Sequence, residues 1–456
     1  MPRLCQTVAS AATFFAALAA VAALAAVGAL AASAALRAGS PPPAAAEPRP
    51  ARPAVTGEAD WPQFHGPNRD NCSPETGLLK TWPEGGPKLL WTFSECGRGF
   101  AGVSVAAGAV YTTGDFGEDQ CVLALDLDGN LRWKVTNGAA WRGEYPGSRS
   151  TPTVDGDRLY QMNAIGRLAA LRAESGEEVW AVDLAEAFGA RRGRWALAES
   201  VTIDGQRLLC LPGGKDALMV ALDKATGRTV WTCRDLDDSA AYCSPRLVTH
   251  GGRRLAITLT RRWIVAVDAA EGKLLWKHPH PTPMGQNVNT PVFHDGHVFV
   301  TGAHHRGGLL LRIHDDAAGA TEVWFRQDLD NCHGGTILLD GRLYGSGCRL
   351  GGKRFYSVDF RTGRDRGTAP DLGLVSLASA EGRLYALGIQ GRVTLLEPGA
   401  EDCRIAGRFD LPGTAPSAGK PRPPGSLKDP CFAHPVVCGG RLYIRHAANL
   451  YAYGLR

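Results

Sequence analysis

The chain has 456 residues, of which 44% are hydrophobic and 21% charged, as is usual for a globular protein. Its formal net charge is +5 and it has no run of five or more basic residues, so nucleic acid is a poor candidate for its partner. The 56 glycines and 29 prolines favour a turn-rich β architecture.

The N-terminal segment differs in composition from the rest. Residues 8–36 carry no charge, which predicts that residues 1–36 are either a signal peptide or an uncleaved signal-anchor. Residues 37–59 are rich in Ala and Pro and are expected to form a linker. Both interpretations place residues 60–456 outside the cytoplasm, in the periplasm or another extracytoplasmic space. The second adds a tether to the inner membrane through residues 8–36.

Eleven cysteines follow Cys5, and an exported domain permits disulfides. The sequence fixes no pairing, and we expect mostly buried free thiols with one or two disulfides. The candidate pairs are Cys96 with Cys121, Cys233 with Cys243, Cys332 with Cys348, and Cys431 with Cys438. No CxxC motif occurs, so zinc ribbons and thioredoxin chemistry lack support.

Eight similar units follow one another along the chain. Each has a short apolar strand, a D-G or G-G turn, an alternating strand, a third apolar strand and a last strand that usually ends in Trp. The units begin near Ser104, Ser150, Glu199, Ser244, Asn289, His333, Ser376 and His434. Four short antiparallel strands at this period predict an all-β fold, an eight-bladed β-propeller.

The last turn of a unit is best seen in "ALDKATGRTVW", residues 221–231, and "AVDAAEGKLLW", residues 266–276. The acidic residue can accept hydrogen bonds from the turn backbone, and the Gly gives the turn its conformational freedom. The Trp is expected to fill the seam against the next blade. We interpret these residues as architectural: Asp223, Gly227, Trp231, Asp268, Gly272 and Trp276, with Trp91, Trp133, Trp180 and Trp324 in other units.

The eighth unit stops after three strands, and "PKLLWTF" with Trp91 is predicted to complete it from the N-terminal side. The sixth unit has Gly367 and the seventh has Phe409 about where the Trp is expected. We therefore expect looser seams at these two blades.

The motif "ALDKATGRTVW" resembles the pyrroloquinoline-quinone (PQQ) repeat, and the resemblance extends over residues 61–456. The opening "DWPQFHGPNRDNCSPETGLLKTWPEGGPKLLW" is similar to the entry segment of exported PQQ-like propellers of planctomycete-type bacteria. The resemblance implies two kinds of relative. Quinoprotein alcohol dehydrogenases bind PQQ and calcium in the axial pocket, whereas the propeller lipoprotein of the outer-membrane β-barrel assembly machinery binds partners and no cofactor.

The dehydrogenase signature is not found in this sequence. The chain has no adjacent Cys pair, and no residue matches a calcium ligand of that family by motif. PQQ with calcium is therefore unsupported by motif, and we assign no catalytic residue and no metal site. His304 and His305 are adjacent, but neighbouring residues on a strand point to opposite faces and cannot easily bind one ion.

Polar residues at the start of the innermost strands are expected to line the axial channel: Arg149, Glu199, Asn289, His333 and His434. They could form a pocket for a small ligand or an ion, or the rim of a solvated channel, and we favour the rim. Residues 141–147 and 186–195 form long loops between blades, and Trp141, Arg142 and Trp195 have the composition of interface anchors. "QFHGPNRDN", with His65, is interpreted as a docking segment.

The sequence thus predicts a non-catalytic, exported binding or scaffold propeller of the PQQ-like repeat family at the cell envelope. Its partner would be a protein, or a small ligand in the axial channel. The alternative is a PQQ-dependent quinoprotein oxidoreductase with a divergent axial pocket.

Overall fold

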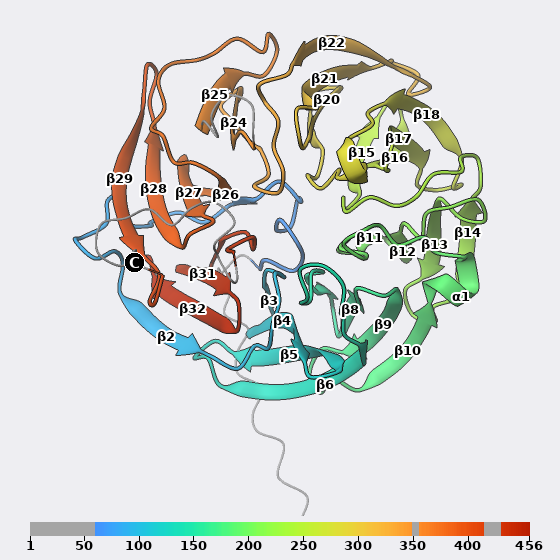
Figure 1. Cartoon of the computed structure of the whole chain (residues 1–456), viewed down its shortest axis with the longest axis horizontal. Coiled ribbons are helices and arrows are strands. Elements are labelled where there is room, and N and C mark those ends of the chain that lie inside the picture. The colour runs from blue at the N-terminus through green and yellow to red at the C-terminus, as the bar shows by residue number, and fades with distance from the viewer. Residues whose placement is uncertain (1–59, 349–354, 415–429) are drawn as a thin grey trace, which may run out of the picture. The chain divides into compact units, whose positions relative to one another are not determined.

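Each repeat unit forms one antiparallel β-sheet, and the sheets follow one another around a common axis (Figure 1). The computed structural model describes residues 60–348, 355–414 and 430–456. Within these residues lie eight sheets, of which six have four strands, one has three and one has five. The predicted all-β, eight-bladed propeller is confirmed. The predicted signal or anchor and the linker lie outside the described residues, and no described helix is long and apolar enough to cross a bilayer.

In the first four blades the strands run from the axis outwards in chain order (Figure 1). Blade 1 contains β3 (Ser104–Ala106), β4 (Ala109–Phe116), β5 (Asp119–Asp126) and β6 (Leu131–Ala139). Blade 2 contains β7 (Thr153–Asp155), β8 (Arg158–Met162), β9 (Arg167–Arg172) and β10 (Glu178–Asp183). Blade 3 contains β11 (Thr202–Asp204), β12 (Arg207–Cys210), β13 (Met219–Asp223) and β14 (Thr229–Cys233). Blade 4 contains β15 (Arg246–His250), β16 (Arg253–Leu259), β17 (Trp263–Asp268) and β18 (Leu274–Pro279).

The remaining blades keep this order with two departures. Blade 5 contains β19 (Val292–His294), β20 (His297–Gly302), β21 (Gly307–Ile313) and β22 (Ala320–Arg326). Blade 6 contains β23 (Ile337–Leu339), β24 (Arg342–Ser346) and β25 (Phe355–Asp359). Blade 7 contains β26 (Val375–Ala380), β27 (Arg383–Gly388), β28 (Arg392–Pro398) and β29 (Cys403–Asp410), with β1 (Cys72–Ser73) as a fifth, parallel strand beside β26. Blade 8 contains β30 (Val436–Cys438), β31 (Arg441–His446) and β32 (Asn449–Gly454), with β2 (Leu89–Phe93) outermost. Two short helical segments lie between blades, α1 (Leu184–Phe188) and the 3-10 turn Pro283–Gly285.

Hydrophobicity explains the radial order of the strands. The middle strands, such as β13 and β17, are almost continuous apolar runs, because a neighbouring blade covers each of their faces. The outermost strands, such as β14, have exposed residues because one edge meets solvent. Tight turns join the strands at glycines with positive φ, for example Gly205 at 61° and Gly227 at 72°.

A Trp–Gly contact recurs between neighbouring blades. A Cβ built on Gly272 would lie 2.4 Å from Cε3 of Trp231, and one on Gly227 would lie 2.8 Å from Trp180. Trp231 also donates its Nε1–H to the carbonyl of Ala269, at 3.2 Å. The same pairing joins Trp91 to Gly129, Trp133 to Gly176, and Trp324 to Gly363. The motif Trp therefore lies flat on the turn of the next blade, where any larger residue than Gly would displace it.

Trp276 is an exception in this series. The next turn has Ala317 in a left-handed conformation with φ of 59°, and Ala317 belongs to the same core cluster as Trp276. Trp276 is buried, and its Nε1 has no hydrogen-bond partner among the described residues.

The N-terminal strand closes the ring as predicted. β2 pairs with β32 in antiparallel register, with Trp91 opposite Ala452, and so supplies the fourth strand of blade 8. Figure 1 shows this strand in blue beside the red strand β32, so the first and last parts of the described chain meet in one blade.

Blade 6 lacks a fourth strand among the described residues. The chain after β25 keeps one isolated pairing, Val358 with Asp365, before Gly367 reaches the position expected for Trp. A Cβ on Gly367 would lie 2.5 Å from the carbonyl oxygen of Glu401 in blade 7. Blade 7 thus approaches too closely for a side chain at this seam.

The prediction that Phe409 occupies the Trp position of blade 7 is wrong. Trp231 and Trp276 lie opposite Ala221 and Ala266, just past the bulge of each hairpin, and in blade 7 this place belongs to Gly407, opposite Leu395. Phe409 lies two residues further along and pairs with Val393. The position is filled by a residue from outside the blade. Trp82 packs over Gly407 and contacts Phe409 and Tyr385, with ring centroids 5.5 and 6.0 Å away.

One of the candidate disulfides is confirmed, that between Cys332 and Cys348. The other three pairings are wrong, because Cys96, Cys121, Cys233, Cys243 and Cys431 are free thiols. Cysteines that are close in the sequence need not be close in the fold. Cys233 lies in the core around blade 3, whereas Cys243 lies in the core around blades 4 and 5, so the two are buried in different seams.

Candidate functional site

The N-terminal segment from Trp61 to Ser73 fills the axis of the propeller. Trp61 pairs with Val105 of blade 1, and the carbonyl of Pro62 accepts a hydrogen bond from Val154 of blade 2 at 2.7 Å. The strand β1 pairs with the innermost strand of blade 7. Figure 1 shows this blue segment running among the innermost strands. The docking segment predicted around His65 is therefore docked inside the ring of its own chain.

Arg69 anchors this segment to blade 3. Its guanidinium donates to the carbonyl of Ser200 at 3.0 Å and to that of Val201, and its Nε donates to Gln63 at 2.9 Å. Arg69 is 4% exposed, and burial lowers its pKa to about 10. Its bonds to neutral carbonyls hold the charge without a carboxylate partner.

Glu199, predicted to line the channel, is buried near Arg69. Its Oε2 accepts a hydrogen bond from the backbone N–H of Leu211 at 3.0 Å, and its Oε1 has no partner among the described residues. Burial raises the pKa of Glu199 to about 8, against the lowering effects of the Leu211 hydrogen bond and the Arg69 charge. The carboxyl group is therefore mostly protonated at neutral pH.

His434 and His333 meet on the axis, as do several aromatic rings. His434 bonds through Nδ1 to the amide of Asn71 at 2.8 Å and through Nε2 to the carbonyl of His333 at 2.9 Å. The ring of His65 lies 4.5 Å from that of His434, and the ring of His333 stacks on Phe432 at 4.2 Å. Burial lowers the pKa of both His333 and His434 to about 4, so these imidazoles are neutral.

The side chains of Asn289 and Arg149 form hydrogen bonds with neighbouring residues and not with each other. The amide of Asn289 donates to Thr301 and to the carbonyl of Asn331, and its oxygen accepts from the N–H of Gly335. Arg149 is half-buried and donates to three carbonyls of its own loop, those of Glu144, Tyr145 and Gly147. The structure thus joins His333 to His434 directly, and it places Arg149, Glu199 and Asn289 in separate hydrogen-bond networks.

These residues are a poor fit for a calcium-bound quinone. Calcium needs charged carboxylate and amide oxygens, but Glu199 is largely neutral and its nearest charge is a guanidinium. The amide oxygen of Asn289 is engaged by Gly335. The space on the axis that a flat cofactor would need is taken by residues 61–73.

A second candidate site lies on the face where the long loops connect successive blades, here called the loop face. Glu144, in the loop of residues 141–147, accepts two hydrogen bonds from Arg194 at 2.8 and 2.6 Å and one from the indole of Trp195 at 3.1 Å. Its carbonyl accepts a bond from the indole of Trp141 at 2.9 Å. The two loops predicted to carry interface anchors are therefore joined into one surface.

The local sequence explains how the second loop is held. Asp183 caps the helix α1 by accepting from Ala185 and Glu186, and Gly189 ends the helix with φ of 62°. Beyond it, the N–H of Trp195 donates to the hydroxyl of Tyr242 at 3.2 Å, and their rings lie 5.8 Å apart.

We call the joined surface the loop-face patch, and it consists of Trp141, Glu144, Tyr145, Arg194, Trp195 and Met284. Tyr145 and Met284 are 55% and 44% exposed, which is high for large apolar side chains. Arg142 reaches away from the patch to Glu118 and to the carbonyl of Gly117.

An arginine-lined hollow adjoins this patch. Arg192, Arg194 and Arg261 line it together with Ser239, Tyr242 and Met284. Arg194 is paired with Glu144, but the exposed side chains of Arg192 and Arg261 have no ion-pair partner among the described residues. The hollow therefore has two guanidinium groups available for an external anion.

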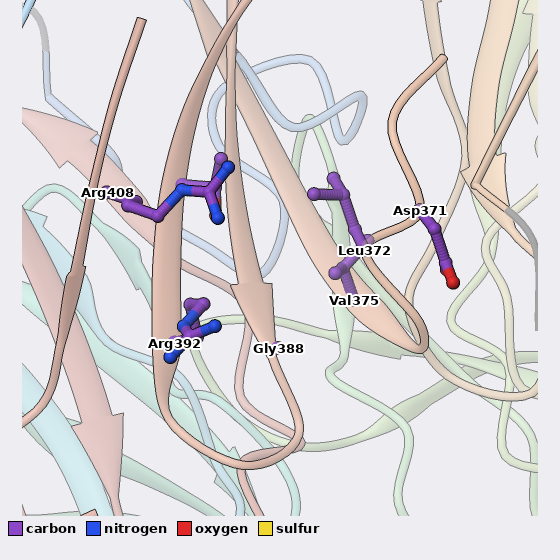
Figure 2. Close-up of a pocket in the computed structure, with 7 residues that line it drawn as sticks. Asp371, Leu372, Val375, Gly388, Arg392 and Arg408 are labelled. Atoms are coloured by element: carbon purple, nitrogen blue, oxygen red, sulfur yellow. The ribbon is translucent and has the colours of Figure 1, made fainter. Parts of the chain in front are cut away.

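A third hollow lies in blade 7 (Figure 2). Arg392 and Arg408 project from β28 and β29, while Asp371 points away from them on the other side. Arg392 is paired with Asp410 at 2.9 Å. None of the predicted axial or loop residues lines this hollow.

The comparisons with known proteins agree with the fold and its repeats. A family model described as outer membrane protein assembly factor BamB matches residues 118–369, more than half of the chain. The protein therefore belongs to this family of PQQ-repeat propellers.

Curated relatives include enzymes. Polyvinylalcohol dehydrogenase of Sphingopyxis sp. (strain 113P3) is 30% identical over 195 residues, which cover 36% of this chain and 27% of that protein. Quinohemoprotein alcohol dehydrogenase ADH IIB of Pseudomonas putida is 28% identical over 154 residues, which cover 31% of this chain and 22% of that protein. The matched part thus spans about a quarter of the length of these relatives.

Solved structures of both kinds share the fold. BamB from Moraxella catarrhalis has a TM-score of 0.53 and 15% identity, over 81% of this chain and 97% of that one. Quinohemoprotein alcohol dehydrogenase from Comamonas testosteroni has a TM-score of 0.58 and 12% identity, over 87% of this chain and 80% of that one. At such low identity these likenesses establish the fold alone.

Proposed function

We propose that this protein is a non-catalytic scaffold that binds a protein partner through its loop-face patch. The observation that carries this proposal is the position of Glu144, whose bonds to Arg194 and Trp195 hold two long loops as one surface. Aromatic and arginine side chains on a pre-organised surface are typical of interface hot spots. The exposed Tyr145 and Met284 supply apolar area at the same place.

The charge of the adjoining hollow indicates the chemistry of the partner. Arg192 and Arg261 present guanidinium groups without internal carboxylates, and guanidinium binds carboxylate in a bidentate manner. We infer a partner whose docking segment carries Asp or Glu beside an apolar residue. Such an interface would weaken with salt, since part of its attraction is between exposed charges.

The filled axis supports a non-catalytic role. In a propeller oxidoreductase the cofactor would need the space on the axis, and here residues 61–73 occupy it with buried hydrogen bonds from Arg69 and Asn71. The curated relatives favour the alternative, a PQQ-dependent oxidoreductase, by name only.

The site of action is proposed from the sequence and the family. An apolar run over residues 8–36 and membership in a family described as an outer membrane assembly factor support export to the cell envelope. A tether to the inner membrane through residues 8–36 and a cleaved signal are both consistent with this proposal.

The binding test uses charge reversal in the hollow. The double variant R192E/R261E removes no internal ion pair, so it should fold as the wild type does. We expect it to lose at least tenfold in affinity for a labelled acidic peptide, such as a hexaglutamate followed by Trp, measured by fluorescence anisotropy at low salt. The matched control is R228E/K273E, with the same charge change at exposed residues of the hairpin turns, and it should bind within twofold of wild type. Equal loss in both variants would mean that only net charge matters and would contradict the proposal.

The test of the alternative is a titration of the protein with PQQ, with and without Ca²⁺, followed by absorbance and thermal unfolding. A ligand that binds the folded state at a hundred times its Kd adds about 2.7 kcal/mol of stability. We expect no calcium-dependent shift. A clear calcium-dependent shift would show that the protein binds PQQ and would overturn the non-catalytic assignment.

A further inference from the structure

The confirmed disulfide lies beside a histidine from the neighbouring blade. Cys332 precedes β23 and Cys348 follows β24, both in blade 6, and the disulfide joins them with a Cα–Cα distance of 5.6 Å. His304 belongs to the turn between β20 and β21 of blade 5. One ring nitrogen of His304 and the two sulfur atoms all lie within 4.8 Å of one another. Among the described residues, no other group of three such side chains gathers its ligand atoms so closely.

The backbone at His304 and His305 has an unusual conformation. His304 and His305 have φ of 52° and 70°, in the left-handed region that non-glycine residues seldom adopt, and here two adopt it in succession. Strain of this kind persists only where the surroundings impose it, and it is common at ligand sites. The Nε2 of His304 also bonds to the amide oxygen of Gln286, which helps to fix the orientation of the ring.

The buried side chain of Asp330 connects the backbone next to His304 with the backbone of Cys348. Asp330 is fully buried, and its Oδ1 accepts from the N–H of Cys348 while its Oδ2 accepts from the N–H of His305, both at 3.1 Å. On the other side, the Asn331 side chain bonds to Gly334 and Gly335 and so fixes the backbone that carries Cys332. None of these bonds involves a sulfur atom. The three side chains should therefore stay together when the disulfide is opened.

We propose that reduction of the Cys332–Cys348 disulfide creates a binding site for a thiophilic cation, Zn²⁺ in the first place, with Cys332, Cys348 and His304 as ligands. A dithiol reductant gives two electrons and two protons to the disulfide and is itself oxidised to a disulfide. Zinc then displaces the two thiol protons and binds two thiolates and one neutral imidazole. Two Cys and one His are a known ligand set for zinc that leaves the fourth position to water.

The site is a redox-gated one, and it goes beyond the proposed scaffold function. In the oxidised state the sulfurs are bonded to each other and cannot act as thiolates. In the reduced state they can move apart to the separation of about 3.8 Å that two Zn–S bonds of about 2.3 Å require at a tetrahedral angle. Cys332 and Cys348 are 3% and 6% exposed, whereas His304 is only partly buried.

The experiment compares oxidised and reduced full-length protein. The protein is reduced with a phosphine, freed of reductant under nitrogen and titrated with Co²⁺, whose thiolate complexes absorb in the near ultraviolet. We expect one equivalent of Co²⁺ to give this band in the reduced protein only, and Zn²⁺ to abolish it. Apart from Cys332 and Cys348, the described cysteines form no disulfide, so the difference between the samples reports on this pair.

The histidine is tested by two matched variants. We expect H304A to weaken Zn²⁺ binding of the reduced protein at least tenfold, measured by competition with a chromophoric chelator. H305A, at the neighbouring exposed residue, should change it less than twofold. The double variant C332S/C348S should show no band under either condition. A band that is absent from reduced wild type, equal in the oxidised protein, or equally strong in H304A would overturn the assignment. These outcomes are independent of peptide binding at the loop-face patch.

Discussion

Trp82 lies directly over Gly407, so that a Cβ built on Gly407 would be 2.5 Å from the Cβ of Trp82. Gly407 is the position of blade 7 that matches the motif Trp of other blades. Trp82 also contacts Tyr385, as Trp133 and Trp180 contact Tyr111 and Tyr160 in their own blades. An indole from a distant segment therefore replaces one that the blade lacks.

The replacement can be tested by moving the indole back. The variant W82G should lose about 3–5 kcal/mol of unfolding free energy, because it removes a buried Trp. W82G/G407W places an indole on the blade itself and should recover part of this loss, at least about 1 kcal/mol. Urea denaturation measures both values. If the double variant is less stable than W82G alone, the space over Gly407 does not accept a Trp from the blade, and the equivalence is wrong.

The seam between blades 3 and 4 allows a similar test with a control of matched backbone. Gly272 and Gly205 both have positive φ, at 74° and 61°, but a Cβ on Gly272 would meet Trp231 at 2.4 Å whereas one on Gly205 would meet nothing within 4 Å. G205A should cost about 1 kcal/mol from backbone strain alone. G272A should cost about 1–3 kcal/mol more, because it also displaces the indole. Equal costs would show that the Trp–Gly contact adds nothing to the seam.

The repeats made the fold predictable, because each blade is built from local signals. Turn residues such as Asp223 and Gly227 lie a few positions from the strands they join, and the apolar runs report burial directly. The Trp position of blade 7 could not be predicted from the spacing in other blades, because its last hairpin is longer. Trp231 comes eight residues after Asp223, but Gly407 comes ten after Glu397. Phe409 is an aromatic residue two positions past Gly407, so the sequence predicts the wrong residue at the Trp position.

The axis was not predictable in the same way. Arg69 bonds to Ser200, 131 residues away, and Asn71 bonds to His434, 363 residues away. No local pattern encodes such contacts, so the residues of the channel rim were identified without the segment that covers them. The composition of the two loops predicts Trp141 and Trp195 as anchors, but nothing in the sequence singles out Glu144, the residue whose hydrogen bonds join the two loops.

The buried histidines predict loss of stability in acid. The pKa of His333 and His434 is about 4 in the folded protein, below the usual value of 6.5, because burial disfavours the charged ring. The unfolded chain therefore binds more protons between pH 6.5 and pH 4, and stability is lost as the pH falls through this window. Each histidine contributes up to about 1.4 kcal/mol per pH unit.

The variant H434Q should reduce this acid sensitivity, measured as the change in urea midpoint between pH 6.5 and pH 5. H305Q, at an exposed histidine, should leave it unchanged and serves as the control. An equal acid response in H434Q and wild type would mean that His434 is protonated in the folded state as easily as in the unfolded one.

Glu199 predicts the opposite dependence, a loss of stability as the pH rises. Its folded pKa is about 8 and its usual value is 4.5, so the folded state holds a proton that the unfolded chain releases between these values. Stability from this group is full below pH 4.5 and declines as the pH rises to about 8, by up to about 1.4 kcal/mol per pH unit. The stability optimum should then lie near pH 6.5, where the gain from the two histidines and the loss from Glu199 cancel.

E199Q removes the ionisation and keeps an oxygen for the N–H of Leu211. We expect it to be more stable than wild type at pH 8, to approach wild type at pH 5, and to lack the decline in stability that wild type shows above about pH 6.5 in urea denaturation. E186Q, at an exposed carboxylate of α1, should follow the wild-type profile. If E199Q instead destabilises the protein equally at both pH values, Glu199 is charged in the folded state and its attraction to Arg69 outweighs its burial.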